Sequence, residues 1–413
     1  MIFIYRFLIN VVLLLSPIIV IIRLLKKKED FFRFKEKIGF FSNKRKKGKL
    51  IWFHGASVGE LQSVVPILEK FEKNKKISQI LVTSNTLSSS KIIKNTKLKK
   101  VIHQFFPIDT NFISKKFISH WKPSKAIFID SEIWPNTILN LEKNRIPIIL
   151  VNGRITKKTF KRWKFFSSFS KKIFSKFSLC LSSSKESYNY LKKLNSKNVK
   201  FIGNLKFSES ENFVKPVDKE LKKIFQTKKI WCASSTHQSE EIFCGQVHLL
   251  LKKKIKNLLT IIIPRHIERT MEIKDDLEKL KLNIHLDEPK KKVDPDTDIY
   301  LVNSYGKTKS FYKICRNVFL GGSLIEHGGQ NPLEAVRYGC SILHGPNIYN
   351  FNEIYNFLKK NEITYKVSAY KNLVDNLSKL LANKNKNKKL QKKMKLIGGE
   401  ILEKTYKKII INN

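Results

Sequence analysis

The feature that most constrains the fold is a repeated alternation of short apolar runs with segments of helical spacing. LIWF (50–53) and QILVTS (79–84) are such runs, and GELQSVVPILEKFEK, which follows the first, has apolar residues three or four apart. Further runs are AIFID (126–130), IPIILVN (146–152), LCLSSS (179–184) and VKFIG (199–203). Continuous apolar strands separated by helices are typical of a parallel sheet covered by helices on both faces. We therefore expect an α/β domain over residues 29–207.

The same pattern starts again in the second half of the chain, after the polar stretch SESENFVKPVDKE (208–220), which we expect to be a linker. The second set of strand candidates is KIWCAS (229–234), LTIIIP (259–264), DIYLVN (298–303), NVFLGG (317–322) and CSILHG (340–345). This predicts a second α/β domain over 221–383 and C-terminal helices over 384–413. Two Rossmann-like domains with parallel sheets facing a central cleft would bind ligands beyond the carboxyl ends of their strands.

The N-terminus differs from the rest of the chain, because residues 1–28 are expected to form one apolar helix. Its polar residues before the basic cluster are Arg6, Asn10, Ser16 and Arg23. The uncharged part, 7–22, is slightly shorter than the roughly 20 residues of a spanning helix. A small-residue cleavage site does not follow it, so we expect membrane attachment rather than a removable signal or a buried core helix. The cluster at 23–28 predicts that the rest of the chain lies on the cytoplasmic side. Spanning the membrane and lying in its interface both remain open.

Composition limits the partners without selecting one. The chain has 81 Lys+Arg against 34 Asp+Glu, a net charge of +47, and lysine is spread along its whole length. A diffuse positive field favours an anionic membrane face or nucleic acid. The five cysteines form no CxxC pair and mostly stand beside apolar runs, which indicates reduced, buried thiols in a cytoplasmic-type compartment.

The first candidate site is HGASVGE (54–60), where a Gly/Ser loop joins a strand to a helix. Such loops often hold phosphate, yet Glu60 would repel one. Ser57 and Glu60 fit a capping box, which taken alone is the better interpretation. The functional alternative makes Glu60 a general base for an acceptor hydroxyl.

Two further candidates follow strands of the first domain. FIDSEIWPN (128–136) places Asp130 and Glu132 after a strand, and two acidic residues in extended chain point the same way. Such a pair can bind sugar hydroxyls, hold a metal, or cap the next helix, although the metal interpretation lacks a third acidic ligand. FIGNLKF presents Lys206 near the linker, where an ordinary surface lysine is the simpler reading.

Candidates in the second domain also lie at strand ends. In WCASSTHQSEE, Ser235 or Thr236 can cap a helix and His237 can face a ligand. IIIPRHIER ends a strand with Arg265 and His266, and arginine at this place can neutralise a phosphate with two hydrogen bonds. Surface charge at a helix-starting turn is the alternative.

The densest motif is FLGGSLIEHGGQNPLEAVRYG (319–339), in a chain with only 16 glycines. Its glycine pairs are Gly321, Gly322, Gly328 and Gly329. Asn331 and Pro332 are expected to begin a helix whose first turn holds Glu334, a carboxylate suited to ribose hydroxyls. The pattern is not GxGxxG, so dinucleotide redox chemistry is poorly supported.

Taken together and in this order, the segments resemble the bacterial 3-deoxy-D-manno-octulosonic acid (Kdo) transferases, which are two-domain GT-B glycosyltransferases. The resemblance covers nearly the whole chain: HGASVGE, IDSEIWPN, LVNGRI, GNLKF, ASSTHQSEE, PRHIER, GGSLIEHGGQNPLEA and GPNIYNF. It implies an inverting, metal-independent transfer of Kdo from CMP-Kdo to a lipid A precursor hydroxyl, with release of CMP. It also implies an enzyme without a cofactor, at the cytoplasmic face of the inner membrane, with no specific nucleic-acid partner.

The resemblance also suggests roles for individual residues. Glu60 matches the catalytic base, Lys206 a transition-state stabiliser, and Asp130 a stabilising carboxylate. The positions that match CMP-binding residues are Arg265, His266, Tyr305, Gly306, Lys307, Asn331, Pro332, Leu333 and Glu334. The chain departs from the family in two places, since glutamate is common where Asp130 and Lys307 stand. Another GT-B glycosyltransferase, a sugar-nucleotide epimerase, and an inactive basic protein that binds membranes or nucleic acid are the alternatives.

Overall fold

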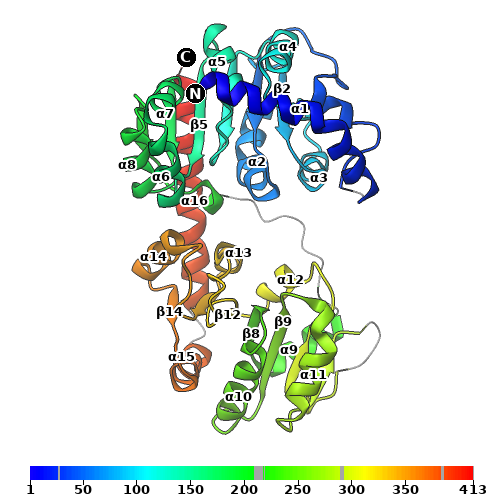
Figure 1. Cartoon of the computed structure of the whole chain (residues 1–413). Helices are drawn as coiled ribbons and strands as arrows, with labels where there is room; N and C mark the ends of the chain where they lie inside the picture. The colour runs from blue at the N-terminus through cyan, green and yellow to red at the C-terminus, as the bar shows by residue number, and fades with distance from the viewer. Residues whose placement is uncertain (27, 209–216, 218, 289–292, 383–385, 413) are drawn as a thin grey trace. The chain divides into compact units, whose positions relative to one another are not determined.

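The computed structural model describes residues 1–413 except 27, 209–216, 218, 289–292, 383–385 and 413 (Figure 1). The chain forms two compact units: unit 1 comprises Met1–Ser210 and Ile397–Asn413, and unit 2 comprises Glu211–Leu396. Most of the stretch expected to be a linker, 208–220, lies outside the described residues.

Unit 1 contains a parallel sheet of seven strands in the order β3-β2-β1-β4-β5-β6-β7. The strands are β1 Leu50–His54, β2 Gln79–Ser84, β3 Val101–Phe105, β4 Lys125–Ile129, β5 Ile148–Gly153, β6 Leu179–Ser182 and β7 Val199–Phe201. The helices are α2 Val58–Glu72, α3 Leu87–Asn95, α4 Asn111–Trp121, α5 Pro135–Lys143, α6 Lys157–Phe165, α7 Ser167–Phe174 and α8 Lys185–Lys193. The strand order reverses between β1 and β4, so the carboxyl ends of these two strands are where a ligand is expected.

Unit 2 repeats this topology with a parallel sheet in the order β10-β11-β9-β8-β12-β13-β14. Its strands are β8 Lys229–Thr236, β9 Leu258–Pro264, β10 Ile284–Leu286, β11 Ile299–Leu301, β12 Asn317–Leu320, β13 Ser341–His344 and β14 Thr364–Lys366. Its helices are α9 Lys219–Thr227, α10 Glu240–Lys252, α11 Thr270–Glu278, α12 Thr308–Tyr312, α13 Leu333–Arg337, α14 Asn352–Lys360 and α15 Tyr370–Ala382. Here the order reverses between β8 and β12.

Each sheet is the centre of its own apolar core. All residues of β1, β4 and β5 are buried, as expected for strands covered on both faces. Trp52 and Phe128 pack in unit 1 with ring centroids 5.5 Å apart, and Trp231 is fully buried in unit 2. The five cysteines are free and buried, which confirms the expectation from their spacing. The expected architecture of two Rossmann-like domains with parallel sheets is confirmed.

The last helix, α16 (Lys386–Ile411), begins in unit 2 and ends in unit 1. The Nζ of buried Lys125 donates to the carbonyl of Ile409 over 2.6 Å, which ties the end of α16 to the start of β4. Gly398 lies against the backbone of Phe207, and a Cβ at this glycine would be 2.3 Å from that carbonyl oxygen. The end of the chain therefore belongs to unit 1. The sequence predicted C-terminal helices but did not indicate which domain they join.

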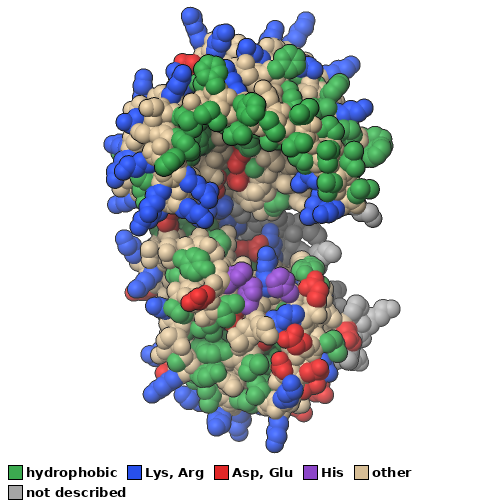
Figure 2. Space-filling view, viewed as in Figure 1, with side chains coloured by type: hydrophobic (Ala, Val, Ile, Leu, Met, Phe, Trp, Pro, Cys, Tyr) green, Lys and Arg blue, Asp and Glu red, His purple; other side chains and the backbone are tan. Residues whose placement is uncertain are grey.

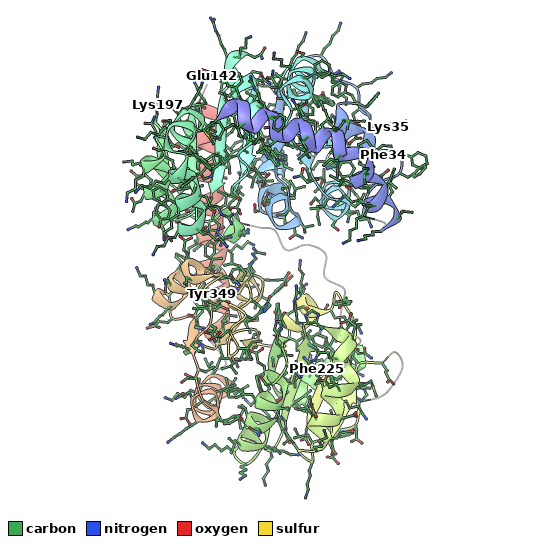
Figure 3. All side chains as sticks on the ribbon, in the orientation of Figure 1. Phe34, Lys35, Glu142, Lys197, Phe225 and Tyr349 are labelled. Carbon is green, nitrogen blue, oxygen red and sulfur yellow. The ribbon has the colours of Figure 1, made fainter. Side chains whose placement is uncertain are left out.

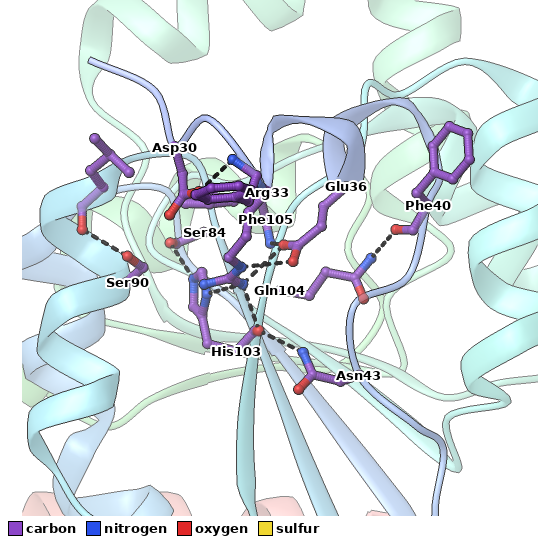
Figure 4. Close-up of polar contacts among 12 residues, drawn as sticks. Asp30, Arg33, Glu36, Phe40, Asn43, Ser84, Ser90, His103, Gln104 and Phe105 are labelled. Carbon is purple, nitrogen blue, oxygen red and sulfur yellow. Dashed lines mark hydrogen bonds and ion pairs between the residues drawn. The ribbon is translucent and has the colours of Figure 1, made fainter. Parts of the chain in front are cut away.

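The segment after α1 (Ile2–Leu25) covers the edge strand β3 (Figure 4). Glu36 accepts a hydrogen bond from the N–H of Phe105 over 2.6 Å, and Arg33 donates to the carbonyl of His103 over 2.8 Å. Arg33 also makes two hydrogen bonds to Glu36 and lies 4.8 Å from the centre of the Phe105 ring. These side chains satisfy backbone groups that an edge strand would otherwise expose.

Candidate functional site

The candidate residues of unit 1 follow β1, β4 and β7, and the first two of these strands flank the point where strand order reverses. Glu60 stands in the first turn of α2, after β1, while Asp130 and Glu132 stand in the loop after β4. Lys206 lies in a short 3-10 helix, Leu205–Ser208, which follows β7 and contacts α2. The fold therefore brings three carboxylates and one ammonium group to the same edge of the sheet.

Glu60 takes part in the capping box expected from the sequence. Ser57 is the N-cap of α2, and the Glu60 carboxylate accepts hydrogen bonds from the N–H of Ala56 (2.7 Å) and the hydroxyl of Ser57 (2.8 Å). Burial and then the nearby negative charge of Glu132 raise the pKa of Glu60 to about 7, and Asp130 adds to this effect. The Ser57 and Ala56 hydrogen bonds act in the opposite direction. The result is a carboxyl group that exchanges its proton near neutral pH.

Asp130 lies in a tight turn rather than in extended chain. Its φ is +60°, and the N–H of Glu132 donates to the carbonyl of Ile129 over 3.2 Å. The expectation that Asp130 and Glu132 point the same way from an extended strand was therefore wrong, because β4 ends at Ile129. Burial raises the pKa of Asp130, while Lys206, with its Nζ 4.0 Å from the carboxylate, lowers it. Within the described part of the chain, the buried Oδ1 of Asp130 has no hydrogen-bond partner.

Glu132 is held in place by two buried aromatic-ring nitrogens. Its Oε2 accepts from Nε1 of Trp134 over 2.9 Å and lies 3.2 Å from Nε2 of the fully buried His54. A carboxylate only accepts hydrogen bonds, so we assign a hydrogen to the Nε2 atom of His54, which donates it to Glu132. The other ring nitrogen of His54 is 3.0 Å from the hydroxyl of Thr83, which in turn accepts from Trp52. The sequence did not single out His54, although it opens the HGASVGE motif.

Helix α5 is capped by a residue that the sequence analysis did not name. The N–H groups of Asn136 and Thr137 donate to the buried carboxylate of Asp109, at 2.9 and 2.8 Å. The interpretation of Asp130 or Glu132 as a cap for this helix was therefore wrong, since Asp109 from the loop before α4 takes the role. The two carboxylates after β4 are left to face the edge of the sheet.

The turn that carries Lys206 is fixed by a buried asparagine at the end of β5. Asn152 has a φ of +56°, and its side-chain oxygen accepts from the N–H of Leu205 over 2.8 Å. The N–H of Lys206 donates to the side chain of Asn204 over 3.0 Å. These hydrogen bonds fix the backbone of the turn from which the Lys206 side chain extends.

In unit 2 an arginine and three histidines gather at and near the ends of β8 and β9. The N–H of Arg265, which follows β9, donates to the carbonyl of Thr236 at the end of β8 over 3.0 Å. The ring of His237 lies 6.0 Å from that of His266 and 4.3 Å from that of His327, measured between centroids. Burial and the surrounding positive groups, His327 first, lower the pKa of His237 to about 4. Figure 2 shows histidine side chains gathered on one face of this unit.

The glycine loop after β12 wraps around a buried carboxylate. Glu240, in the first turn of α10, accepts hydrogen bonds from the backbone N–H groups of Gly322 (2.6 Å) and Ser323 (3.0 Å). It also accepts from those of Leu324 and His237, both at 3.0 Å. Three N–H groups of the glycine loop are thus bonded to the protein itself. The residue at the centre was missed, although a glutamate in the first turn of a helix is a recognisable signal.

Ser235 and Thr236 do not cap α10, which corrects that interpretation. Thr236 is the last residue of β8, and the N-cap is Ser239, whose side chain makes no capping hydrogen bond. Three residues separate Thr236 from the first residue of α10, so neither hydroxyl is at the N-cap position. Gly321 lies against this segment, and a Cβ there would be 2.4 Å from the carbonyl oxygen of Ser235. Close packing of β12 against β8 requires this glycine.

The helix expected after the second glycine pair is present as α13, with Pro332 as its N-cap and Glu334 in its first turn. Asn331 accepts from the N–H of Leu333 over 3.2 Å, and Glu334 is 3.3 Å from the Nζ of Lys309. Gly322, Gly328 and Gly329 have φ values of +63°, +93° and +76°. At Gly328 a Cβ would also lie 2.3 Å from the side chain of Asn350.

The residues at 305–307 form a turn before α12. The hydroxyl of the exposed Tyr305 donates to Glu268 over 3.0 Å, and Gly306 has a φ of +87°. Lys307 is the N-cap of α12 and pairs with Asp287 over 2.6 Å. The positive charge at 307 is thus balanced inside the unit. Among the described residues, no group of three or more His, Cys, Asp or Glu side chains is arranged to hold a metal ion.

Comparison with known proteins places these features in a family. Residues 32–209 match the family model described as 3-deoxy-D-manno-octulosonic-acid transferase (kdotransferase). A 3-deoxy-D-manno-octulosonic acid transferase of Rickettsia bellii is 32% identical over 91% of this chain and 90% of its own length. The enzyme of the same name from Haemophilus influenzae is 28% identical over 95% of this chain and 93% of its own.

A comparison of structures agrees on the fold. The UDP-GlcNAc 2-epimerase of Neisseria meningitidis, solved with UDP-GlcNAc bound, matches with a TM-score of 0.59 at 12% identity, over 88% of this chain and 99% of that one. At that identity the match shows a shared GT-B-like fold and nothing about the reaction. The sequence relatives, which match over nearly the full length, show the family. The chain belongs to the Kdo transferase family of lipopolysaccharide biosynthesis and is a glycosyltransferase.

Proposed function

We propose that this chain transfers a Kdo residue from CMP-Kdo to a hydroxyl of a lipid A precursor and releases CMP. The observation that carries the proposal is the Glu60 carboxyl, whose pKa is raised to about 7 at the carboxyl edge of the unit 1 sheet, in a member of the Kdo transferase family. Both proposed substrates come from the resemblance of the motifs. The chemistry of the described residues supports them as follows.

Unit 1 supplies the base for the acceptor. A general base works best when its pKa is near the working pH, and a carboxyl with a pKa of about 7 meets this condition. Glu60 takes the proton of the attacking hydroxyl as the oxygen bonds to the anomeric carbon of Kdo and the bond to CMP breaks. Attack from the face opposite the departing CMP inverts the anomeric centre.

Lys206 and Asp130 act next to this base. The Nζ of Lys206 lies 4.0 Å from Asp130, which leaves room for the ammonium group to turn towards developing negative charge. The Oδ1 of Asp130, which has no hydrogen-bond partner among the described residues, is available to a sugar hydroxyl. Its shorter side chain, compared with the glutamate common in the family, places that acceptor closer to the backbone.

Unit 2 binds the nucleotide. Arg265 and His266 are exposed at the carboxyl end of β9, where an arginine can bind the CMP phosphate with two hydrogen bonds. Glu334 is the candidate for the ribose hydroxyls, and Tyr305 and Gly306 lie on a neighbouring turn that can contact the nucleotide. The guanidinium charge of Arg265 offsets the charge on the departing phosphate, so the proposed transfer needs no metal ion.

The N-terminal helix holds the enzyme at its lipid acceptor. Helix α1 has a mean hydropathy of 2.6 over its most apolar window, and is long and apolar enough to cross a membrane. The net charge of +47 favours an anionic lipid face. We place the protein on the cytoplasmic face of the inner membrane, and we expect no specific nucleic-acid partner.

The test is an assay of the full-length chain with CMP-Kdo, with and without tetraacylated lipid A precursor. We expect CMP release only when the precursor is present, and a product whose mass increases by one or more Kdo residues. Release of CMP at the same rate without the precursor would contradict a transferase. A binding competition separates the proposal from an epimerase-like function, because we expect CMP to bind more tightly than UDP or GDP.

A further inference from the structure

Helix α1 has one covered stripe and one broad apolar face. With about 100° of rotation per residue, Tyr5, Ser16 and Arg23 fall within about 20° of one another around the helix. All three are buried or half-buried against unit 1. The opposite face is apolar except for Asn10: Phe3, Phe7, Leu14 and Leu25 are between 69 and 79% exposed. The exposed apolar side chains from Phe3 to Leu25 are called the outer face below.

The beginning of α1 is attached to unit 1 by side-chain hydrogen bonds. The hydroxyl of Tyr5 donates to the buried carboxylate of Asp109 over 2.8 Å. Arg6 donates to the side chains of Asn136 (2.9 Å) and Asn111 (3.4 Å), at the starts of α5 and α4. Polar groups at the amino end of α1 therefore bind the same loops that frame the candidate site.

The end of α1 is attached to unit 1 as well. Arg23 pairs with the buried Glu29 over 2.5 Å, and Lys37 binds the same carboxylate over 2.6 Å. The segment that follows is fixed to β3 through Arg33 and Glu36, as described above (Figure 4). Figure 3 shows Phe34 and Lys35 on this segment, close to the end of α1.

These two attachments decide how the helix can meet a membrane. Tyr5 and Arg23 are 18 residues apart, about 27 Å along a helix. A helix crossing a hydrocarbon core about 30 Å thick would place its first turn on the far side, away from Asp109 and Asn136. The contacts at both ends are compatible only with a helix that lies along the surface of unit 1.

The apolar surface continues beyond α1. Phe31 and Phe32 follow the helix and are 70 and 85% exposed, and Phe112, next to Asn111, is 75% exposed. Figure 2 shows hydrophobic side chains spread over the face of unit 1 that α1 crosses, with lysines around them. Exposed cations close to these phenylalanines are Lys26, Lys28, Lys35, Lys115 and Lys116. A broad apolar face bordered by cations matches the acyl and headgroup layers of an anionic bilayer.

We propose that α1 lies in the plane of the membrane, with its outer face and Phe31, Phe32 and Phe112 inserted in one anionic leaflet. This inference rests on the membrane association proposed above and specifies its geometry. Unit 1 is then held against the leaflet by the starts of α4 and α5 as well as by α1, rather than hanging from a spanning anchor. The acceptor lipid would be reached from the leaflet in which the helix lies.

The test measures the depth of α1 in vesicles of phosphatidylethanolamine and phosphatidylglycerol. Nitroxide labels on cysteines placed at Ile4, Leu14 and Leu25 report depth through their relative accessibility to oxygen and to a water-soluble nickel complex. The parent chain, whose five cysteines are buried, is the labelling control. We expect the labels at Leu14 and Leu25 at one common depth, about 5–10 Å below the headgroups. The label at Ile4, about 80° from Leu14 around the helix, should lie nearer the headgroups of the same leaflet. All three should be reduced by ascorbate added outside the vesicles.

A profile in which Leu14 is deepest and Ile4 is protected from ascorbate would overturn the proposal in favour of a spanning helix. Labels that stay in water would overturn it too. Kdo transfer is measured on the same vesicles so that the two proposals can fail independently. Transfer together with a spanning profile would refute the in-plane geometry and leave the proposed function intact.

A second comparison tests the attachments directly. The double substitution Tyr5→Phe with Arg6→Ala should shift the depth and mobility of the label at Ile4, and leave the label at Leu25 unchanged. Arg162→Ala, which removes an exposed arginine from α6 of the same unit, is the matched control and should shift neither label. An unchanged Ile4 label in the double variant would show that these contacts do not hold the helix.

Discussion

Two glutamates in equivalent places of the two units have opposite environments. Glu60 and Glu240 both stand in the first turn of the helix that follows the first strand of their sheet. Glu240 is buried and accepts four hydrogen bonds from backbone N–H groups, three of which belong to the neighbouring glycine loop. Glu60 is half-buried, bonds only within its own helix start, and lies near two further carboxylates.

The difference shows that one topology can give the same position either a raised pKa or a dense set of hydrogen bonds. Many hydrogen-bond donors around a carboxylate fix its position, as at Glu240. Few donors and two like charges leave the proton of Glu60 easy to exchange near neutral pH. The guanidinium group of Arg265 in unit 2 instead suits an anionic donor.

The largest expected effect is on catalysis, from Glu60→Gln. Gln keeps the size and the hydrogen-bonding oxygen but cannot accept the hydroxyl proton, so CMP release from CMP-Kdo should fall by about 10²–10⁴-fold. The raised pKa means that ionising Glu60 costs stability as the pH rises from its ordinary value of 4.5 through about 7. Thermal unfolding above pH 7 should therefore find the variant at least as stable as the parent. Unchanged turnover would exclude Glu60 as the base.

For Glu240→Ala the comparison predicts that the main loss is in stability rather than in the chemical step. Removing this carboxylate leaves buried N–H groups of the glycine loop without an acceptor, which should cost about 3 kcal/mol or more in the free energy of unfolding. Urea denaturation measures the loss, and CMP affinity should fall with it because the loop is no longer fixed. Glu240→Gln keeps one oxygen acceptor, so its free energy of unfolding should lie between that of the parent and that of Glu240→Ala. A stable Glu240→Ala protein with normal CMP binding would refute the structural role.

A smaller effect is expected on the pH dependence, from Glu132→Gln. The negative charge of Glu132 helps to raise the pKa of Glu60, so its removal should move the acid limb of kcat/KM to lower pH. Burial, the larger cause, remains, so the limb should stay above the range of an ordinary glutamate. Glu142→Gln, which removes an exposed carboxylate paired with Lys176 in the same unit, is the control and should leave the profile in place. A limb that does not move in Glu132→Gln would contradict this coupling.

The smallest effect is expected from Ser57→Ala. Loss of the N-cap should cost about 1 kcal/mol of stability, measured by thermal unfolding. The same substitution removes a hydrogen bond that lowers the pKa of Glu60, so the acid limb should move to higher pH, opposite to Glu132→Gln. A shift in the same direction for both variants would show that the limb does not report Glu60.

The strands that pattern reasoning missed all lie at the edges of the two sheets, although one edge strand, β7, was predicted. Central strands such as β1 and β9 were found because burial on both faces requires continuous apolar runs. β3, β10 and β14 were missed, and all three are edge strands. An edge strand is covered on fewer sides, so its sequence tolerates residues such as His103, His285 and Lys366, and its apolar signal is weak.

The site shows the same limit. Motif order was enough to select Glu60, Lys206 and Arg265 as candidates, because each follows a strand in a local pattern. His54, Asp109 and Glu240 were not selected, because their partners are distant in the sequence: Glu132, the start of α5 and the loop after β12. Only the packing of the sheet brings these pairs together.

The sequence by itself determined that the chain has two parallel α/β domains, an apolar N-terminal helix and a Kdo transferase motif set, since periodicity and local motifs record each of these. The tertiary structure decided which carboxyl group has a pKa near neutrality and how α1 lies against unit 1. Both depend on contacts between distant residues, such as the charge of Glu132 near Glu60 and the hydrogen bond from Tyr5 to Asp109. A pKa and a helix orientation are set by surroundings in space, which a linear pattern does not contain.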